Sequence, residues 1–159
     1  MTMRLRRLDA SSIDSLDLEA LEELLGYGAP NVVDLDKAWD GIAWLISEER
    51  RDKPYMLPDP SLPSTQAIYG VDPEKGAGGI VFRNPPARVK RIAAALESLD
   101  EAQLRPFFQP ARMLAEKVYP PIWNEGDHVF GFLLGHFEAL REVYRQAAKA
   151  GDGVVTTVG

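Results

Sequence analysis

Residues 127–159 read DHVFGFLLGHFEALREVYRQAAKAGDGVVTTVG, and this stretch decides the fold. Its large apolar side chains recur every three or four residues, which predicts one buried face of a long helix. They are Phe130, Leu133, Leu134, Phe137, Leu140, Tyr144 and Ala147. Asp127 can cap the start of this helix, and Gly151 can end it. Val154 to Val158 are rich in β-branched residues and follow a Gly-Asp-Gly turn, so we expect a terminal strand.

Shorter elements are expected upstream of this helix. Apolar spacing predicts one or two helices within Ser11–Leu25, and a further helix of about Lys37–Glu49 that Asp36 caps. Another helix is expected to start at Pro86 and to bury Val89, Ile92, Ala93 and Leu96. A last short helix is expected to be capped by Ser98 and to end at Pro106. Apolar runs predict a first strand over Arg4–Leu8 at a sheet edge, and core strands at Ala67–Tyr69 and Ile80–Phe82. We interpret Asn31–Leu35 as a turn, Gly70–Gly79 as turn-rich, and the proline-rich Lys53–Pro63 as an irregular connection.

These elements predict a single α+β domain over residues 1–159, with a small mixed or antiparallel sheet packed against several helices. Hydrophobic residues make up 45% of the chain and charged residues 26%, a balance typical of a chain that buries its own core. We therefore expect independent folding of one domain.

Composition also excludes several classes of function. Cysteine is absent, which removes disulfides, thiolate metal sites and cysteine nucleophiles, and which fits a cytoplasmic location. The net charge of -6 repels a phosphate backbone, so we expect no nucleic-acid partner. Asp9, Asp14 and Asp17 interrupt any apolar stretch after the basic start, which argues against an export signal. The apolar runs are far shorter than the roughly 20 residues that span a bilayer, so we expect no membrane insertion.

Asp34 and Asp36 have the spacing of the paired aspartates in one class of phosphatases. Residues 32–36 are similar to the strand and paired aspartates of haloacid-dehalogenase phosphatases, in which one carboxylate attacks phosphorus and the other works as acid and base. Ala38 stands where those enzymes have Thr or Val, and their regular alternation of strands and helices is not seen. A calcium loop fails too, because Trp39 occupies its glycine position. We therefore interpret Asp34 or Asp36 as a helix-capping residue.

Other chemical motifs are equally incomplete. His128 and His136 are eight residues apart, and on a helix that spacing separates two side chains by about 12 Å and rotates them about 80° apart. Together with Glu125 and Asp127 they do not form a plausible metal site, so we expect no metal and no cofactor. Residues 76–79 precede a strand, which favours a hairpin loop over a phosphate-binding loop. No serine lies in Gly-x-Ser-x-Gly, and we predict no catalytic residues.

Three further residues are candidates for contact with a ligand or a partner. Arg83 ends an apolar run and can present its guanidinium to an anion, although a structural salt bridge to Asp34, Asp36 or Asp40 is the simpler interpretation. Tyr119 and Trp123 flank two prolines, a composition suited either to packing over the core or to gripping a partner.

Four segments in this order resemble the small bacterial YfbM-like proteins, a family defined by domain of unknown function 1877. They are Asp34–Gly41, Val81–Arg83 with the Pro86–Leu96 helix, Tyr119–Trp123, and the long helix ending at Gly151 and Asp152. The resemblance covers most of the chain and implies an α+β domain with its strands sheltered by helices. It implies no known activity and no catalytic residues.

Two hypotheses of function follow. The first is a non-enzymatic cytoplasmic protein-binding domain, for example one that masks a partner as bacterial immunity proteins do. The second is a small-molecule or phosphate-handling enzyme that gathers Asp34, Asp36, Asp40 and Arg83 in one pocket. The residues that we predict for a ligand or partner surface are Asp34, Asp36, Trp39, Asp40, Arg83, Tyr119 and Trp123.

Overall fold

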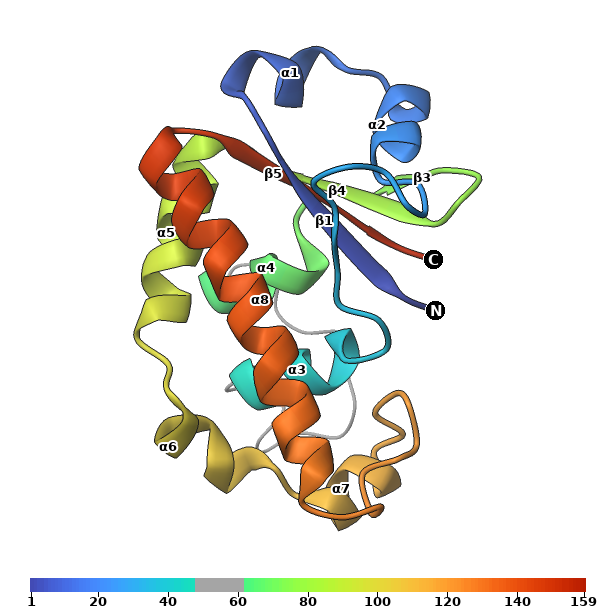
Figure 1. Ribbon diagram of the computed structural model, residues 1–159, viewed down its shortest axis with the longest axis vertical. Coiled ribbons are helices and arrows are strands. Elements are labelled where there is room, and N and C mark those ends of the chain that lie inside the picture. The colour runs from blue at the N-terminus through green and yellow to red at the C-terminus, as the bar shows by residue number, and fades with distance from the viewer. Residues whose placement is uncertain (48–61) are drawn as a thin grey trace.

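A five-stranded antiparallel sheet organises the chain, as seen in a computed structural model that describes residues 1–47 and 62–159. Its strands lie in the order β2-β1-β5-β4-β3. Their bounds are β1 (Met3–Leu8), β2 (Val33–Asp34), β3 (Glu74–Lys75), β4 (Ile80–Asn84) and β5 (Gly153–Val158). The expected α+β single domain is therefore confirmed, and the sheet is antiparallel (Figure 1).

The last strand occupies the centre of the sheet. All six residues of β1 pair with β5, from Met3 opposite Val158 to Leu8 opposite Gly153, and β4 pairs with the other edge of β5. The predicted terminal strand is thus confirmed. The predicted edge position of β1 is wrong, because Arg4 and Leu5 also pair with Asp34 and Val33. The edge strand β2 lies within the segment that we had interpreted as a turn.

Helices cover both faces of this sheet. Neighbouring side chains of a strand point to opposite faces, so consecutive apolar residues of β5 belong to two different cores. Val154 belongs to the larger core beneath α3 (Trp39–Ile46), α4 (Pro63–Tyr69), α5 (Pro86–Glu97) and α8 (His128–Ala150). Val155 belongs to a smaller core beneath α1 (Ala10–Ser15) and α2 (Leu18–Leu24), which lie on the other side of the sheet (Figure 1).

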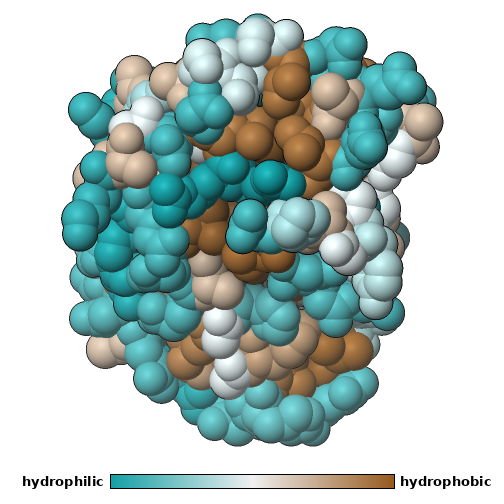
Figure 2. Space-filling view, turned by 45° about the horizontal axis from the view of Figure 1, so that its top comes forward, coloured by the Kyte–Doolittle hydropathy of each residue, from teal (hydrophilic) through white to brown (hydrophobic). Residues whose placement is uncertain are grey.

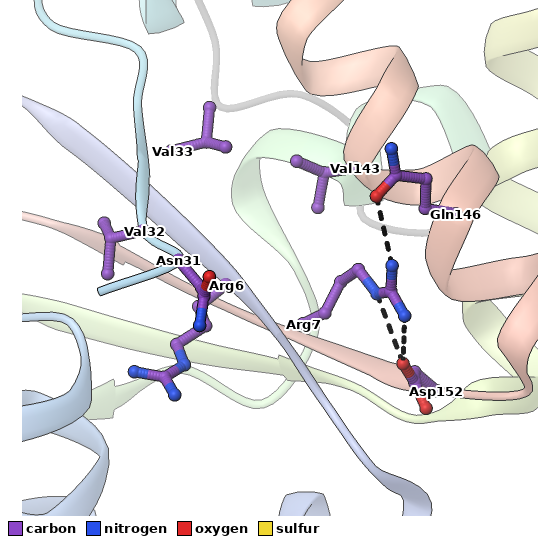
Figure 3. A pocket seen from close by; sticks show the side chains of 8 residues that line it. All are labelled: Arg6, Arg7, Asn31, Val32, Val33, Val143, Gln146 and Asp152. Atoms are coloured by element: carbon purple, nitrogen blue, oxygen red, sulfur yellow. Dashed lines mark hydrogen bonds and ion pairs between the residues drawn. The ribbon is translucent and has the colours of Figure 1, made fainter. Parts of the chain in front are cut away.

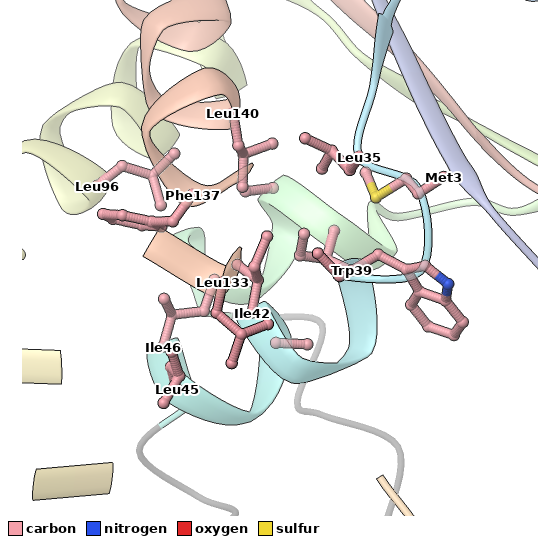
Figure 4. Packing of buried hydrophobic residues seen from close by; sticks show 14 of the residues in the cluster. Met3, Leu35, Trp39, Ile42, Leu45, Ile46, Leu96, Leu133, Phe137 and Leu140 are labelled. Atoms are coloured by element: carbon pink, nitrogen blue, oxygen red, sulfur yellow. The ribbon is translucent and has the colours of Figure 1, made fainter. Parts of the chain in front are cut away.

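The long C-terminal helix α8 is the main support of the larger core. Its buried side chains match the predicted stripe closely, except that Leu134 is only partly buried; they are Val129, Phe130, Leu133, Phe137, Leu140, Val143, Tyr144 and Ala147. Figure 4 shows several of them meeting α3 and α5. Gly151 ends the helix in the left-handed conformation, with φ of 74°. Asp127 occupies the cap position, but its side chain makes no capping bond and instead pairs with Arg105.

Several predicted boundaries need correction. Ala67–Tyr69 is the end of helix α4 and not a strand, because Pro63 starts a helix in which Thr65 to Ile68 are buried. Asp36 does not cap α3: its φ of 46° places it in a turn, and Ala38 occupies the cap position without a side-chain bond. The capping box of α6 (Glu101–Leu104) uses Asp100 and Gln103, while Ser98 bonds to Ala95.

Other segments complete the chain. A short 3-10 helix (Arg105–Phe107) and α7 (Pro110–Ala115) follow α6, and neither was predicted. The predicted helix at Pro86 and the one or two helices within Ser11–Leu25 are confirmed as α5, α1 and α2. The glycine-rich loop of residues 76–79 joins β3 to β4, so the hairpin interpretation is correct. The proline-rich connection, up to residue 61, lies outside the described residues.

Candidate functional site

The buried carboxylate of Asp40 connects three segments of the larger core. It lies in the first turn of α3 and is 1% exposed. One carboxylate oxygen accepts a hydrogen bond from the Tyr69 hydroxyl at 2.8 Å, and the other accepts one from the Tyr119 backbone N–H at 2.9 Å. Asp40 therefore fastens α3 to α4 and to the loop before α8.

The tryptophans of the predicted surface belong to this core. Trp39 is 6% exposed, and its ring packs edge-on against Tyr69, with centroids 6.0 Å apart, and at a tilt against Tyr119. Trp123 is 0% exposed and donates its indole N–H to the Val118 carbonyl at 2.7 Å. Of the two interpretations of the Tyr119–Trp123 segment, core packing is the one that describes Trp123, whereas Tyr119 is partly exposed.

Arg83 lies on the opposite face of the sheet from Asp40. It is two residues from Val81, which belongs to the smaller core, and its guanidinium donates to the carbonyls of Ile13 and Leu16 at 3.0 and 2.7 Å. Its carboxylate partner is Glu74, at 2.6 Å, and not one of the three predicted aspartates. The Arg83 hydrogen bond holds the pKa of Glu74 below its usual value. The expectation that Arg83 forms a structural salt bridge is therefore correct, but its partner is Glu74 and not an aspartate.

The paired aspartates lie apart from these groups. Asp34, on β2, and Asp36, in the following turn, are both exposed, and a carboxylate oxygen of Asp34 accepts the Asp36 backbone N–H at 2.7 Å. That bond stabilises the left-handed turn at Asp36. The structure thus brings Trp39, Asp40 and Tyr119 together and leaves Asp34, Asp36 and Arg83 elsewhere.

The sequence did not predict a pocket that opens at the β2 edge of the sheet (Figure 3). Its volume is about 450 Å³, within the range of small-ligand sites. The lining residues come from β1, from β2 and the segment before it, from α8 and from the turn after α8; they are Arg6, Arg7, Asn31, Val32, Val33, Val143, Gln146 and Asp152. These residues are far apart in the sequence, so they form no local motif. Only the cluster of arginines at the start of the chain could have indicated part of this site from the sequence.

Arg7 is held firmly within this pocket. Two of its guanidinium nitrogens donate to the same oxygen of Asp152, at 2.8 and 3.2 Å, and a third donates to Gln146 at 3.1 Å. Asp152 is fixed in turn, because its backbone N–H donates to the Ala147 carbonyl at the end of α8. Arg7 therefore connects β1 to the turn between α8 and β5.

Neither a metal centre nor a membrane-spanning helix is found in the described part of the chain. Across residues 1–47 and 62–159, no three His, Asp or Glu side chains gather in a way that could hold a metal ion. Over the same residues, every helix is too short or too polar to cross a bilayer.

Comparison with known proteins places the chain in a family. It matches the model of a domain of unknown function (DUF1877) over residues 1–157. The fold is similar to that of a protein of unknown function, YfbM from Escherichia coli, with a TM-score of 0.78 and 21% identity over 100% of both chains. No curated protein matches the chain. The match over nearly every residue shows that the chain belongs to the DUF1877 family.

Proposed function

We propose that this domain is a non-enzymatic, cytoplasmic protein-binding domain that engages a basic surface of its partner. The observation that carries the proposal is a strongly uneven distribution of charge. Residues 9–36 contain no Lys or Arg, and their acidic residues are Asp9, Asp14, Asp17, Glu19, Glu22, Glu23, Asp34 and Asp36. This segment includes α1 and α2, which form the outer layer over one face of the sheet.

Apolar groups accompany the acids on this layer, which we call the α1–α2 face and define by Asp14, Leu16, Leu18, Glu19, Glu23, Leu24 and Tyr27. The three leucines are only partly buried, and Tyr27, just after α2, is 95% exposed. Figure 2 shows apolar atoms gathered at the end of the molecule that carries α1 and α2, bordered by hydrophilic ones. An exposed aromatic among apolar and charged groups is the composition of many binding surfaces.

Masking of a basic partner follows from these properties. A concentrated negative field speeds the encounter with a positively charged protein and suppresses binding to acidic ones. A partner held over the α1–α2 face would have its own basic site covered, as in an immunity-type complex. This mode of action requires no catalytic group in the domain.

The enzymatic alternative receives no support from the arrangement of its proposed residues. A phosphate-handling site needs its carboxylates and its cation within reach of one substrate. Asp40 is buried beneath one face of the sheet, whereas Arg83 is bound on the other face to Glu74 and to two carbonyls, one in α1 and one just after it. Asp34 and Asp36 are exposed on a separate turn.

Affinity capture from the native cell, with the full chain as bait, tests the proposal. We expect a basic protein to be retained through stringent washing and to be lost from the variant E19Q/E23Q/Y27A. The matched control E101Q/E125Q removes two exposed carboxylates outside the α1–α2 face and should retain the partner. Absence of any retained protein, or equal retention by both variants, would contradict the proposal.

A further inference from the structure

Two arginines of β1 lie on the side of the sheet that α1 and α2 cover. Arg6 is opposite Val155, whose side chain belongs to the smaller core, and residues directly opposite each other in a sheet share a face. Arg4 is two residues away along β1, so it shares this face, with the two Cα atoms about 7 Å apart. Figure 3 shows the side chains of Arg6 and Arg7 pointing to opposite sides of β1.

Neither Arg4 nor Arg6 has a carboxylate partner among the described residues. The one hydrogen bond that the Arg6 guanidinium makes there goes to the Leu24 carbonyl and is long, at 3.4 Å. The Nε atom of Arg4 is shielded from water and has no hydrogen-bond partner in the described structure. Asp34 is directly opposite Arg4 on β2, but its carboxylate accepts the Asp36 backbone N–H instead.

Arg6 connects this pair of cations to the α1–α2 face. The carbonyl that it contacts belongs to Leu24, which is a member of that face at the end of α2. Residues 9–36 contain no Lys or Arg, so the cations beside the face come from the sheet. Arg83, which lies on the same side, is neutralised by Glu74. The acidic α1–α2 face is therefore bordered along β1 by a cationic margin, which we define as Arg4 and Arg6.

A partner that covers the α1–α2 face also approaches the cationic margin. A partner surface with basic residues alone would be attracted by Glu19 and Glu23 but repelled by Arg4 and Arg6. Such a complex would also remove the two guanidinium groups from water without a counter-ion, and an unpaired charge in an interface is strongly unfavourable. A carboxylate at this position removes both penalties, because arginine donates two parallel hydrogen bonds to a carboxylate.

We infer that the contact surface of the partner is bipolar. Its basic residues meet the acids of the α1–α2 face, and an Asp or Glu beside them pairs with Arg4 and Arg6. The inference rests on the proposed function, because it concerns the same partner. Opposite charges at two places in one interface also fix the orientation in which the partner docks and disfavour a uniformly basic competitor.

Titration of the purified partner, as retained in the affinity capture, into the variant R4Q tests the inference by calorimetry. The Arg4 guanidinium has no hydrogen bond to lose within the described structure, so R4Q should keep the circular dichroism and unfolding temperature of the unmodified protein. It should bind the partner about five- to tenfold more weakly. R4K keeps the charge and should bind within about threefold of the unmodified protein. A partner that has no carboxylate here would bind R4Q more tightly, because repulsion is removed.

Two controls separate a specific carboxylate contact from a general effect of charge. Heptalysine amide has no carboxylate and should bind R4Q at least as tightly as it binds the unmodified protein. R91Q removes an exposed arginine from α5 and should bind the partner like the unmodified protein. The inference alone is overturned if R4Q binds the partner equally or more tightly, or if R4Q weakens heptalysine by the same factor. Capture of no partner would overturn the proposed function and this inference with it.

Discussion

Asn84 donates a hydrogen bond from its amide to the Tyr144 hydroxyl at 2.9 Å, and both side chains are completely buried. The Tyr144 hydroxyl donates in turn to the Ala67 carbonyl at 3.2 Å. Burial raises the pKa of Tyr144 well above its usual value, so the hydroxyl keeps its proton and remains a donor. This chain of bonds connects β4, α8 and α4 inside the larger core.

Replacing Tyr144 with phenylalanine should lower the free energy of unfolding by about 1 to 3 kcal/mol. The substitution keeps the ring but leaves the Ala67 carbonyl and one Asn84 N–H without this partner in a dry core. Urea denaturation followed by circular dichroism measures the change. Y27F removes a hydroxyl from a side chain that is 95% exposed and should leave the stability unchanged. Equal stabilities of the two variants would refute the role of the buried bonds.

Replacing Asp40 with asparagine should destabilise the protein by about 1 to 3 kcal/mol. Both oxygens of Asp40 accept hydrogen bonds, and an amide would turn an NH₂ group toward either the Tyr69 hydroxyl or the Tyr119 N–H. Thermal unfolding provides the measurement. The matched control is D36N, because Asp36 is exposed and asparagine tolerates its positive φ. If D36N lowers the stability as much as D40N, Asp40 does not have the fastening role.

Two glycines in helices should respond to alanine in opposite directions. A Cβ on Gly41 would lie 2.5 Å from the Trp123 ring and 2.7 Å from Leu133, so G41A should cost about 1 to 3 kcal/mol through overpacking. A Cβ on Gly135, within α8, would meet nothing within 4 Å, so G135A should stabilise the helix by roughly 0.5 to 1 kcal/mol. Denaturant midpoints of the two variants on either side of the unmodified value would confirm the prediction; two shifts in the same direction would not.

The Glu74–Arg83 pair predicts a dependence of stability on acid. Arg83 lowers the pKa of Glu74 in the folded state below its usual value, so the pair stabilises the fold at pH values above that usual pKa. The stabilisation is lost as the pH falls through the lowered pKa, because protonation then occurs in the folded state too. We expect the stability difference between the unmodified protein and E74Q to be small, since Glu74 is 38% exposed, and to shrink on acidification. Unfolding curves from neutral to acidic pH measure it, and a constant difference would exclude the linkage.

Long periodic segments were predictable from the sequence, whereas several of the short ones were not. A spacing of three or four residues between apolar side chains is compatible with a helix and not with a strand. The helix α5 has this spacing, and its buried residues are Val89, Ile92, Ala93 and Leu96. Ala67–Tyr69 is an apolar run too short to distinguish a strand from a buried helix end. The strands β2 and β3 have two residues each and gain their identity only from the neighbours with which they pair.

The candidate site was harder to predict for a related reason. Trp39, Asp40 and Trp123 have side chains that serve either a core or a binding surface, and only tertiary packing decides which. The pocket depends on contacts between Arg7 and Asp152, which are separated by most of the chain. No pattern of neighbouring residues records such an arrangement.

The central position of β5 has a consequence for synthesis in the cell. During translation β1 leaves the ribosome before the other described strands and helices, whereas β5, which pairs with its full length, leaves after all of them. Helices such as α5 can form beforehand, but the order of strands requires residues 153–158 before the two halves of the sheet can join. A nascent chain arrested upstream of Gly153 should therefore remain sensitive to protease and available to chaperones, and release of the last strand should complete folding in one step.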